Sequence, residues 1–512
     1  MKRIFFALLV VVLVLCGCSK TDELEKNAVR IDLSDDGISV AGKPVETDAS
    51  NKVYVANDIV YYEEGKDFTY GEGTEKDSHS VEEANAHTVV HITEPGRYVL
   101  SGELSLGQIA VDLGEDAEKD PEAVVTLILK DVDITCEVAP AIIFYNVYEC
   151  CSSDEEKATK DVDTSKAGAN VVIADGTENN ISGSYVEKVY KSYELNEDGT
   201  EVTDSKKLHK YDGAFYSKKT MNINGGKKGN GILNIKAENE GLDSELHLTI
   251  NGGFINITSG NDGINTNEDN VSVTTINGGT INILCDGSTG EGDGIDSNGW
   301  LVINGGTVVA QACATSGDAG IDSDKGIYIN GGKVIASGNM LDRIAGGNQT
   351  YAVFNFASRQ AGQSTYMIKN ADGKIASEFS PVNAFTYLII AGDELVPGDY
   401  TFWQGTTRLA GSSMKNMQGG VPRGDRPERP QGEQNEKGTP PEVPDGMERP
   451  EPPSGERPQV PRGERPERPE GMENMTPPDN MGGNMMTNDE TSSIFIIAKG
   501  GNLFANVCPV RN

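Results

Sequence analysis

The chain has 512 residues and a formal net charge of −35 at pH 7. This excess of acidic residues argues against nucleic acid and against anionic lipid as the main partner, because like charges repel one another. It favours cations, neutral polymers, or acidic polymers that are bridged by cations.

The N-terminus has the pattern of an export signal. Lys2 and Arg3 precede an apolar run from Ile4 to Leu15, which is short for a membrane-spanning helix. Cys16, Gly17 and Cys18 follow this run. This pattern resembles a bacterial secretion signal with a lipobox. We predict that residues 1–18 form a lipoprotein signal peptide with lipidated Cys18, the alternative being an uncleaved anchor. The product would be exported and held at the bacterial cell envelope, outside the cytoplasm, with its lipid as the only membrane contact.

The next part of the chain changes from polar to strand-like. Residues 19–84 are polar and acidic, and we predict a tether and the region that leads into the first coil. Segments rich in β-branched residues then predict early coils at 88–92, 97–102, 124–130 and 170–173. Two charged insertions, at 150–167 and 185–210, are predicted to form protruding loops.

The tetrapeptide Ile-Asn-Gly-Gly occurs five times, at spacings of 27, 26, 27 and 26 residues. So regular a repeat predicts stacked supersecondary units. Short β-branched runs flank each copy, and no amphipathic helical stretch of useful length separates them. We therefore predict an all-β fold with a parallel β-helix over residues 85–340. The isoleucines of the repeats are Ile223, Ile250, Ile276, Ile303 and Ile329.

The asparagine of each repeat is predicted to stack on its neighbours. Equivalent residues of successive coils lie about 4.8 Å apart, so each side-chain amide can bond to the next. The Gly pairs are predicted to supply turns with positive φ. We interpret this ladder as structural, with ligand contact as the alternative. Its members are Asn224, Asn251, Asn277, Asn304 and Asn330.

A second, acidic pattern precedes the later repeats, as in Asp-Gly-Ile-Asp-Ser at 293–297. Stacked coils would align its acidic positions in two neighbouring columns, with Asp318 one place out of register. Carboxylates so close repel one another, and a hard divalent cation with oxygen ligands offsets this repulsion. We predict calcium, the alternative being ordinary turn residues on a solvated edge. The candidate ligands are Asp243, Asp262, Asn265, Asp293, Asp296, Asp318, Asp322 and Asp324.

The regular period stops after Ile335. Residues 341–420 stay strand-like, and we predict a capping β-sheet that covers the open C-terminal end of the coils. Fifteen of the 22 prolines fall between residues 421 and 478, so residues 421–488 are predicted to be a Pro-rich disordered loop. Two further segments, 493–497 and 502–507, are strand-like. We therefore predict that residues 489–512 belong to the capping sheet.

Several segments resemble one known family. They are the Gly-Arg-Tyr-Val-Leu-Ser-Gly run at 96–102, the strand at 127–132, Asp-Gly-Thr-Glu-Asn at 175–179, the Asp-Gly-Ile turns and the Ile-Asn-Gly-Gly corners. The chain resembles, over residues 85–410 and the final strands, a family of bacterial surface carbohydrate-binding proteins first recognised in cellulolytic clostridia. The resemblance implies a right-handed parallel β-helix similar to family 9 pectate lyases, association with calcium, and binding of cellulose-like and pectic polymers. The resemblance also implies that the calcium ligands are Asp243, Asp262, Asp293, Asp296 and Asp322.

Three functions remain open at this point. The prediction is a lipid-anchored surface protein that binds polysaccharide on a calcium-loaded β-helix without catalysis. The first alternative is a calcium-dependent lyase of the pectate type, which needs a basic residue beside the acidic column to take a proton. Lys325 directly follows Asp324, and Lys218, Lys219, Lys227 and Lys228 are also near in sequence. The second alternative is a non-catalytic scaffold or adhesin.

Overall fold

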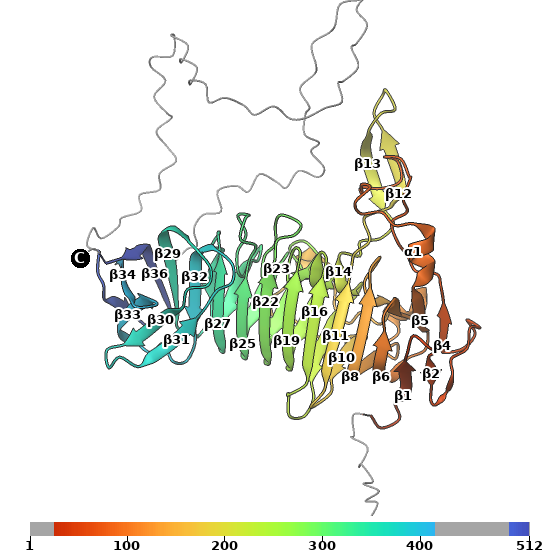
Figure 1. Cartoon of the computed structure of the whole chain (residues 1–512), viewed down its shortest axis with the longest axis horizontal. Helices are drawn as coiled ribbons and strands as arrows, with labels where there is room; N and C mark the ends of the chain where they lie inside the picture. The colour runs from red at the N-terminus through yellow and green to blue at the C-terminus, as the bar shows by residue number, and fades with distance from the viewer. Residues whose placement is uncertain (1–24, 415–490, 511–512) are drawn as a thin grey trace, which may run out of the picture. The chain divides into compact units, whose positions relative to one another are not determined.

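The computed structural model describes residues 25–414 and 491–510. The predicted signal peptide with Cys18 and the Pro-rich segment 421–488 lie outside the described residues. The described chain is mostly β, and its long parallel sheets are consistent with a β-helix-like fold (Figure 1). Within the described ranges, no helix is long and apolar enough to cross a membrane.

Three rows of parallel strands run along the stack of coils. The first row consists of β6 (Gly96–Leu104), β8 (Val125–Cys136), β10 (Ala169–Ile173), β15 (Met221–Gly225), β18 (His247–Ile250), β21 (Val273–Ile276), β24 (Trp300–Ile303) and β26 (Gly326–Ile329). The second row begins at the far end of the long strand β8 and consists of β11 (Glu178–Gly183), β16 (Ile232–Ala237), β19 (Phe254–Ser259), β22 (Thr280–Cys285), β25 (Thr307–Gln311) and β27 (Lys333–Gly338).

The third row forms a separate sheet. It consists of β5 (Thr88–Ile92), β7 (Gly107–Asp112), β9 (Ile142–Asn146), β14 (Gly213–Ser217), β17 (Glu240–Ser244), β20 (Ile264–Thr266) and β23 (Ile295–Ser297), with β4 (Val53–Ala56) antiparallel at its edge. Because the strands of one row belong to successive coils, equivalent residues of each repeat become direct neighbours.

The repeat isoleucines build the core in this way. Ile250 pairs with Ile276, and Ile276 pairs with Ile303 in the first row. All three side chains are completely buried. Full burial of one such side chain contributes about 1.5–3 kcal/mol.

Truncation of one of these buried isoleucines should therefore lower the stability of the protein. Ile276→Ala should lower the free energy of unfolding by about 2–5 kcal/mol, because it removes buried methyl groups and leaves a cavity between two rungs. Glu291→Ala, at an exposed turn, should change it by less than about 0.5 kcal/mol. Denaturant unfolding of the two variants checks this expectation, and equal effects would contradict it.

The glycine pair of each repeat has two different roles. In four repeats the second glycine has positive φ, as for Gly279 (90°) and Gly306 (81°). The first glycine of each pair does not have positive φ, so the prediction of positive φ was wrong for this position. An added Cβ at Gly305 would instead lie 2.7 Å from the carbonyl oxygen of Asn277, so the close approach of successive turns excludes a side chain.

Two asparagine ladders run along the stack. In the first, the Nδ2 of each repeat asparagine donates to the Oδ1 of the preceding one at 2.8–2.9 Å, from Asn330 back to Asn224. This is the ladder that the sequence predicts. A second ladder, which the sequence analysis missed, joins strands of the second row at 2.9 Å per rung. It consists of Asn180, Asn234, Asn256 and Asn282.

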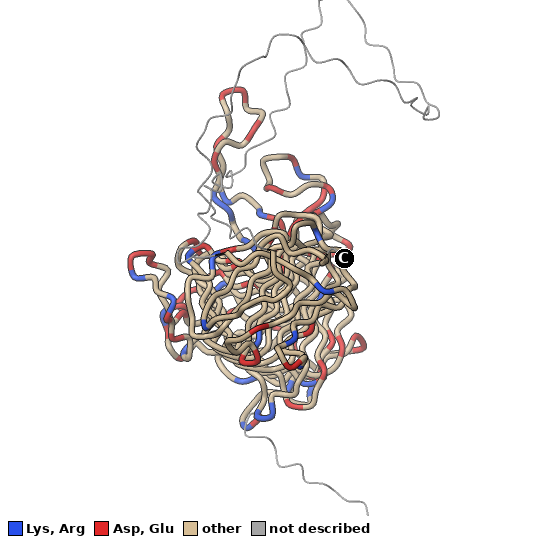
Figure 2. Tube along the Cα trace, turned by 90° about the vertical axis from the view of Figure 1, so that its left-hand side faces the viewer, with Lys and Arg blue, Asp and Glu red and all other residues tan. Residues whose placement is uncertain are grey.

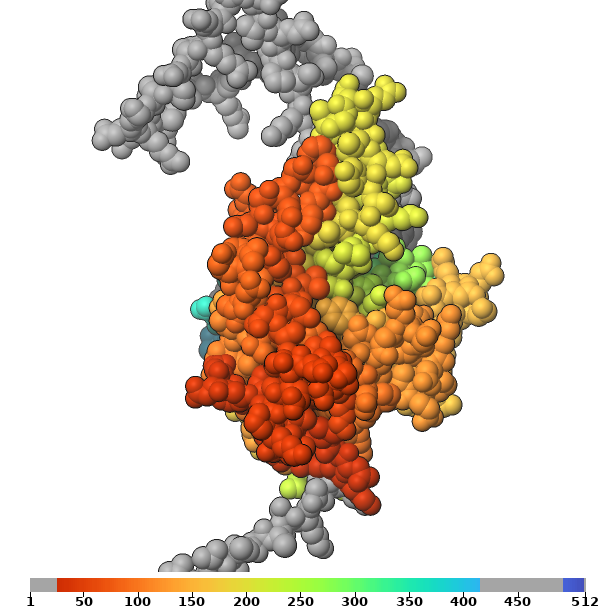
Figure 3. Space-filling view, turned by 90° about the vertical axis from the view of Figure 1, so that its right-hand side faces the viewer, coloured from red at the N-terminus to blue at the C-terminus, as the bar shows by residue number. Residues whose placement is uncertain are grey.

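The N-terminal residues cover the first coil. β1 (Val29–Leu33) pairs in parallel with β6, followed by β2 (Ser39–Val40), β3 (Lys43–Pro44) and α1 (Val81–Ala86). Figure 3 shows these residues in red over this end of the stack, with the yellow hairpin β12 (Tyr190–Leu195) and β13 (Val202–Lys207) rising beside them. The hairpin protrudes, as predicted for the insertion at 185–210 (Figure 1).

The insertion at 150–167, here called the strap, behaves differently. It begins near η1 (Glu115–Lys119), contains η2 (Glu155–Lys157), and lies along the outer side of the first row. The Thr164 hydroxyl bonds to the Thr249 hydroxyl at 2.8 Å, and Lys160 Nζ lies 5.2 Å from the centre of the Tyr328 ring. Most residues of the strap are exposed, as expected for a protruding loop, but these contacts also tie it to strands β18 and β26.

The C-terminal strands are largely antiparallel. They are β28 (Ile344–Gly346), β29 (Tyr351–Gln360), β30 (Tyr366–Asn370), β31 (Ile375–Phe379), β32 (Phe385–Ala391), β33 (Gly398–Gln404), β34 (Thr407–Ser413), β35 (Phe495–Ile497) and β36 (Gly501–Pro509). β32 pairs antiparallel with β27, the last strand of the second row. Aromatic residues such as Phe354 and Phe402 form a separate core here, with ring centres 4.3 Å apart. In Figure 2 the charged residues lie mostly around the outline of the Cα trace.

Candidate metal centre

The third row aligns the acidic pattern as the sequence predicts. Asp243 pairs with Asn265, and Asn265 pairs with Asp296. The amide of Asp322 donates to the Ile295 carbonyl at 2.7 Å, which places Asp322 on the next coil. These four residues therefore follow one another along one side of the third row.

The second column also forms. The backbone bonds from Gly241 to Asp262 and from Gly263 to Asp293 place these two acidic residues in successive coils. Gly294 bonds to Ala319 in the same way, so Asp318 falls one residue out of register. Its Oδ2 instead accepts the Gly292 amide at 2.6 Å.

Three carboxylates of the two columns converge. Asp293, Asp296 and Asp322 each offer an oxygen, and these oxygens lie within 4.8 Å of one another. Asp293 and Asp322 are buried and Asp296 is half-buried. This group, here called the carboxylate cluster, could hold a metal ion.

Burial and mutual repulsion dominate the electrostatics around the carboxylate cluster. Burial, then the charges of Asp262, Asp296 and Asp322, raise the pKa of Asp293 well above its usual range. Burial, then the charges of Asp296 and Glu240, do the same to the pKa of Asp262. The pKa increases mean that ionisation of these carboxyls is costly without a positive charge, and a bound cation would supply one.

A lysine supplies positive charge at the beginning of the columns. Lys210 Nζ donates to Asn267 Oδ1 at 2.9 Å, and Asn267 in turn donates to Asp243 at 2.6 Å. Burial alone would lower the pKa of Lys210, but the carboxylates of Glu245, Asp212 and Asp243 raise it above its usual value. The repeat does not predict this contact, because Lys210 belongs to an insertion outside it.

Buried oxygen atoms in the preceding coils of the same columns would also suit a hard cation. Glu240 Oε2, Asp243 Oδ2 and Asn265 Oδ1 are buried and lack a hydrogen-bond partner within the described protein. Asn265 Nδ2 already donates to Glu240 Oε1 at 2.9 Å, which leaves its oxygen as an acceptor. Carboxylate and amide oxygens are the ligands that Ca²⁺ prefers, and buried acceptors without partners are unfavourable unless a ligand pairs with them.

Two of the remaining predicted residues lie apart from the carboxylate cluster. Asp324 is exposed, two residues beyond Asp322. Lys325, the predicted base of a lyase, has its Nζ 3.8 Å from Glu155 Oε1 of the strap and 5.2 Å from the centre of the Trp300 ring. Its ammonium group therefore faces the strap, which lies along the first row.

A second group within the described ranges could also hold a metal, namely Glu149, Cys150 and Cys151. Both carboxylate oxygens of Glu149 already accept hydrogen bonds, including two from Thr220 at 2.8 Å. Thiol sulfur is a soft ligand and suits transition metals rather than calcium. The carboxylate cluster is therefore the better candidate for a hard cation.

A comparison with known protein families assigns the chain to one of them. The family described as carbohydrate-binding domain-containing protein matches residues 86–395, more than half of the chain. The chain belongs to this family. The match confirms the resemblance that the repeat and turn motifs indicated, and it spans the three rows and the carboxylate cluster of this carbohydrate-binding domain-containing protein.

The chain was also compared with solved structures and with curated proteins. This carbohydrate-binding domain-containing protein is similar to the polysaccharide lyase-like protein from C. thermocellum, solved as a gadolinium derivative, with 20% sequence identity and a TM-score of 0.34. The alignment covers 62% of this chain and 99% of that chain. A comparison with curated proteins found no match.

Proposed function

We propose that this chain is a lipid-anchored surface protein that binds polysaccharide, cellulose-like or pectic, without catalysis. In this proposal the parallel rows are a right-handed β-helix, closed by the C-terminal strands as a capping sheet and loaded with calcium at the carboxylate cluster. Cys18 carries the lipid and holds the exported protein at the bacterial cell envelope. The family match supports carbohydrate as the ligand.

One observation carries the calcium part of the proposal. Three carboxylates from two successive coils meet within 4.8 Å of one another, and the same columns contain buried oxygens that lack hydrogen-bond partners. Asp293, Asp296 and Asp322 would hold the ion, with Asp262 and Asn265 beside them. A bound Ca²⁺ supplies positive charge that neutralises the columns and offers coordination positions to a carboxylate of an acidic sugar.

Neither Lys210 nor Lys325 is a suitable base for the lyase alternative. Abstraction of a proton requires a neutral amine, so the pKa of the lysine must be lowered. Lys210, the lysine beside the columns, has a raised pKa. Lys325 lies against Glu155 and Trp300. Binding without catalysis is therefore the better-supported function, and a scaffold or adhesin differs from it only in having no polymer ligand.

Retention on polygalacturonate tests the proposed function. With calcium present, the full-length protein should be retained on the polymer, and a chelator should release it. Absorbance of unsaturated uronates should stay at the level of the polymer alone. Rising absorbance would instead establish a lyase. Absence of retention on either polygalacturonate or cellulose would contradict the polysaccharide proposal and leave the scaffold function.

A further inference from the structure

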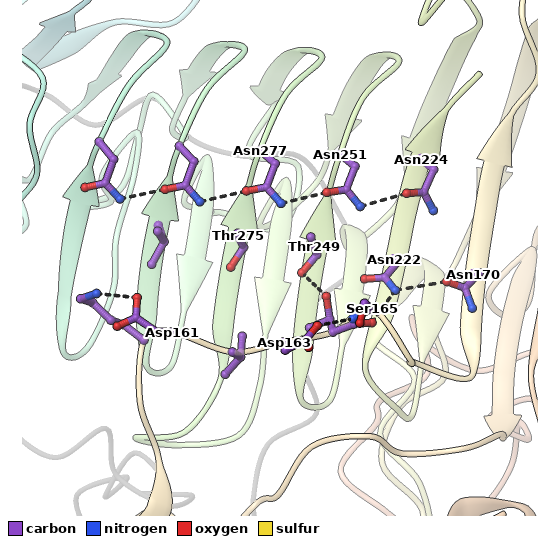
Figure 4. Close-up of a pocket in the computed structure, with 16 residues that line it drawn as sticks. Asp161, Asp163, Ser165, Asn170, Asn222, Asn224, Thr249, Asn251, Thr275 and Asn277 are labelled. Atoms are coloured by element: carbon purple, nitrogen blue, oxygen red, sulfur yellow. Dashed lines mark hydrogen bonds and ion pairs between the residues drawn. The ribbon is translucent and has the colours of Figure 1, made fainter. Parts of the chain in front are cut away.

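A groove of about 690 Å³ lies between the strap and the first asparagine ladder. This volume falls within the range typical of ligand sites. Residues 160–165 of the strap line one side, and the five ladder asparagines line the other. Figure 4 shows Asn224, Asn251 and Asn277 in line along the stack, with Thr249, Thr275 and the strap across from them. The groove is on the first row, whereas the carboxylate cluster is on the separate sheet of the third row.

The ladder leaves part of its hydrogen-bonding capacity unused. A side-chain amide has two N–H donors and an oxygen with two acceptor positions. Between Asn251 and Asn304, each rung uses one donor and one acceptor position within the ladder. The middle rungs, Asn251, Asn277 and Asn304, are exposed. Each therefore keeps one donor and one acceptor for a ligand in the groove.

A second line of neutral polar groups runs beside the ladder. Asn222 pairs with Thr249, and Thr249 pairs with Thr275, all on the floor of the groove. Successive strands are about 4.8 Å apart. Asn222 and Thr249 are buried and already bond to Thr164 of the strap, so Thr275, which is half-buried, is the hydroxyl of this line that lies beside the exposed rungs.

The charges of the groove select the class of ligand. Its charged residues are Lys160, Asp161 and Asp163, and Lys160 already pairs with Asp161 at 2.6 Å. Asp163 is exposed on the strap and adds negative charge. An acidic polymer would be repelled here, whereas carboxylates, amides and hydroxyls all bond well to sugar hydroxyls.

We propose that this groove binds a neutral polysaccharide chain lying along the stack, with its hydroxyl groups on the Asn251–Asn277–Asn304 rungs and on the strap. This inference rests on the proposed polysaccharide function, and it assigns neutral and acidic polymers to different rows. The neutral polymer uses the groove, while calcium-bridged binding of uronates uses the carboxylate cluster.

The second ladder provides a matched control. Asn251→Ala with Asn277→Ala removes two rungs inside the groove, and Asn256→Ala with Asn282→Ala removes two rungs of the same kind on the second row. Binding of cellohexaose should weaken about tenfold or more in the first variant, because several hydrogen bonds are lost, and less than about twofold in the second. Calorimetric titration measures both, with retention on amorphous cellulose as a second readout. Equal affinities in the two variants would overturn the proposal.

A variant that keeps the ladder guards against a folding defect. Thr275→Phe places a ring on the floor of the groove and should reduce cellohexaose affinity by a similar factor, with little change in melting temperature. Unchanged affinity would overturn the proposal.

Chelation of calcium separates the two sites. It should abolish retention on polygalacturonate and leave cellohexaose affinity within about twofold, because the groove contains no part of the carboxylate cluster. If wild-type protein binds polygalacturonate but not cellohexaose, the groove assignment fails and the proposed function stands. If it binds neither polymer, both fail.

Discussion

Asp296→Asn with Asp322→Asn should make the protein more stable than wild type without calcium and less stable than wild type with calcium. Without calcium the double variant should melt at a higher temperature than wild type, because two charges are removed from a crowded and partly buried group. With calcium it should melt lower than wild type, because two anionic ligands are lost. Its calcium affinity should fall by about 100-fold or more, and calcium-dependent retention on polygalacturonate should disappear.

Scanning calorimetry and equilibrium dialysis check both parts of this expectation. At a calcium concentration 100 times the dissociation constant, one site adds about 2.7 kcal/mol, which raises the melting temperature of a wild-type chain of this size by about 3 °C. Asp324→Asn is the matched control, since Asp324 is exposed and outside the carboxylate cluster. Unchanged calcium stoichiometry in the double variant would show that the site assignment is wrong.

The calcium-free protein should lose stability as pH rises from about 4 to about 8. Burial, then the charge of Asp212, raise the pKa of Glu240 to about 8 in the folded protein. The pKa values of Asp262 and Asp293 are raised as well. Unfolded carboxyls titrate near pH 4. Stability from these groups is therefore fully present below about pH 4 and is lost as pH rises through the folded pKa values.

Calcium should reverse this trend, because it binds the ionised carboxylates. The difference in melting temperature between calcium-bound and calcium-free protein should be small at pH 5 and largest near pH 8. Glu240→Gln should flatten the calcium-free profile, whereas Glu115→Gln, at an exposed position, should leave it unchanged. A calcium-free melting temperature that rises across this window would contradict the assigned pKa shifts.

The repeat period explains why so much of the fold could be predicted. A period of 26–27 residues fixes which residues become neighbours, so the core rungs, the first ladder and both acidic columns follow from spacing alone. The register also holds where the spacing differs: Ile264 lies 12 residues before Ile276, whereas Ile295 lies 8 before Ile303, yet Asn265 still pairs with Asp296. The second ladder could also have been found, since Ile-Asn-Ile recurs around Asn256 and Asn282 at a spacing of 26 residues.

The parts that the sequence could not place are the insertions. The strap and Lys210 have no counterpart in other coils, so no period indicates where they fold back. The strap lies on the first row because Thr164 bonds to Thr249 and Lys160 lies over the Tyr328 ring. Lys210 lies among the acidic columns because their charge attracts it. The groove and the position of Lys210 therefore could not be predicted from the sequence and are found only in the folded structure.

The most direct measurement is anomalous diffraction from crystals of the protein grown with calcium. We expect a peak within about 2.3–2.6 Å of oxygens from Asp293, Asp296 and Asp322. Fully occupied calcium elsewhere, with no peak at the carboxylate cluster, would contradict the assignment of the cluster as the calcium site.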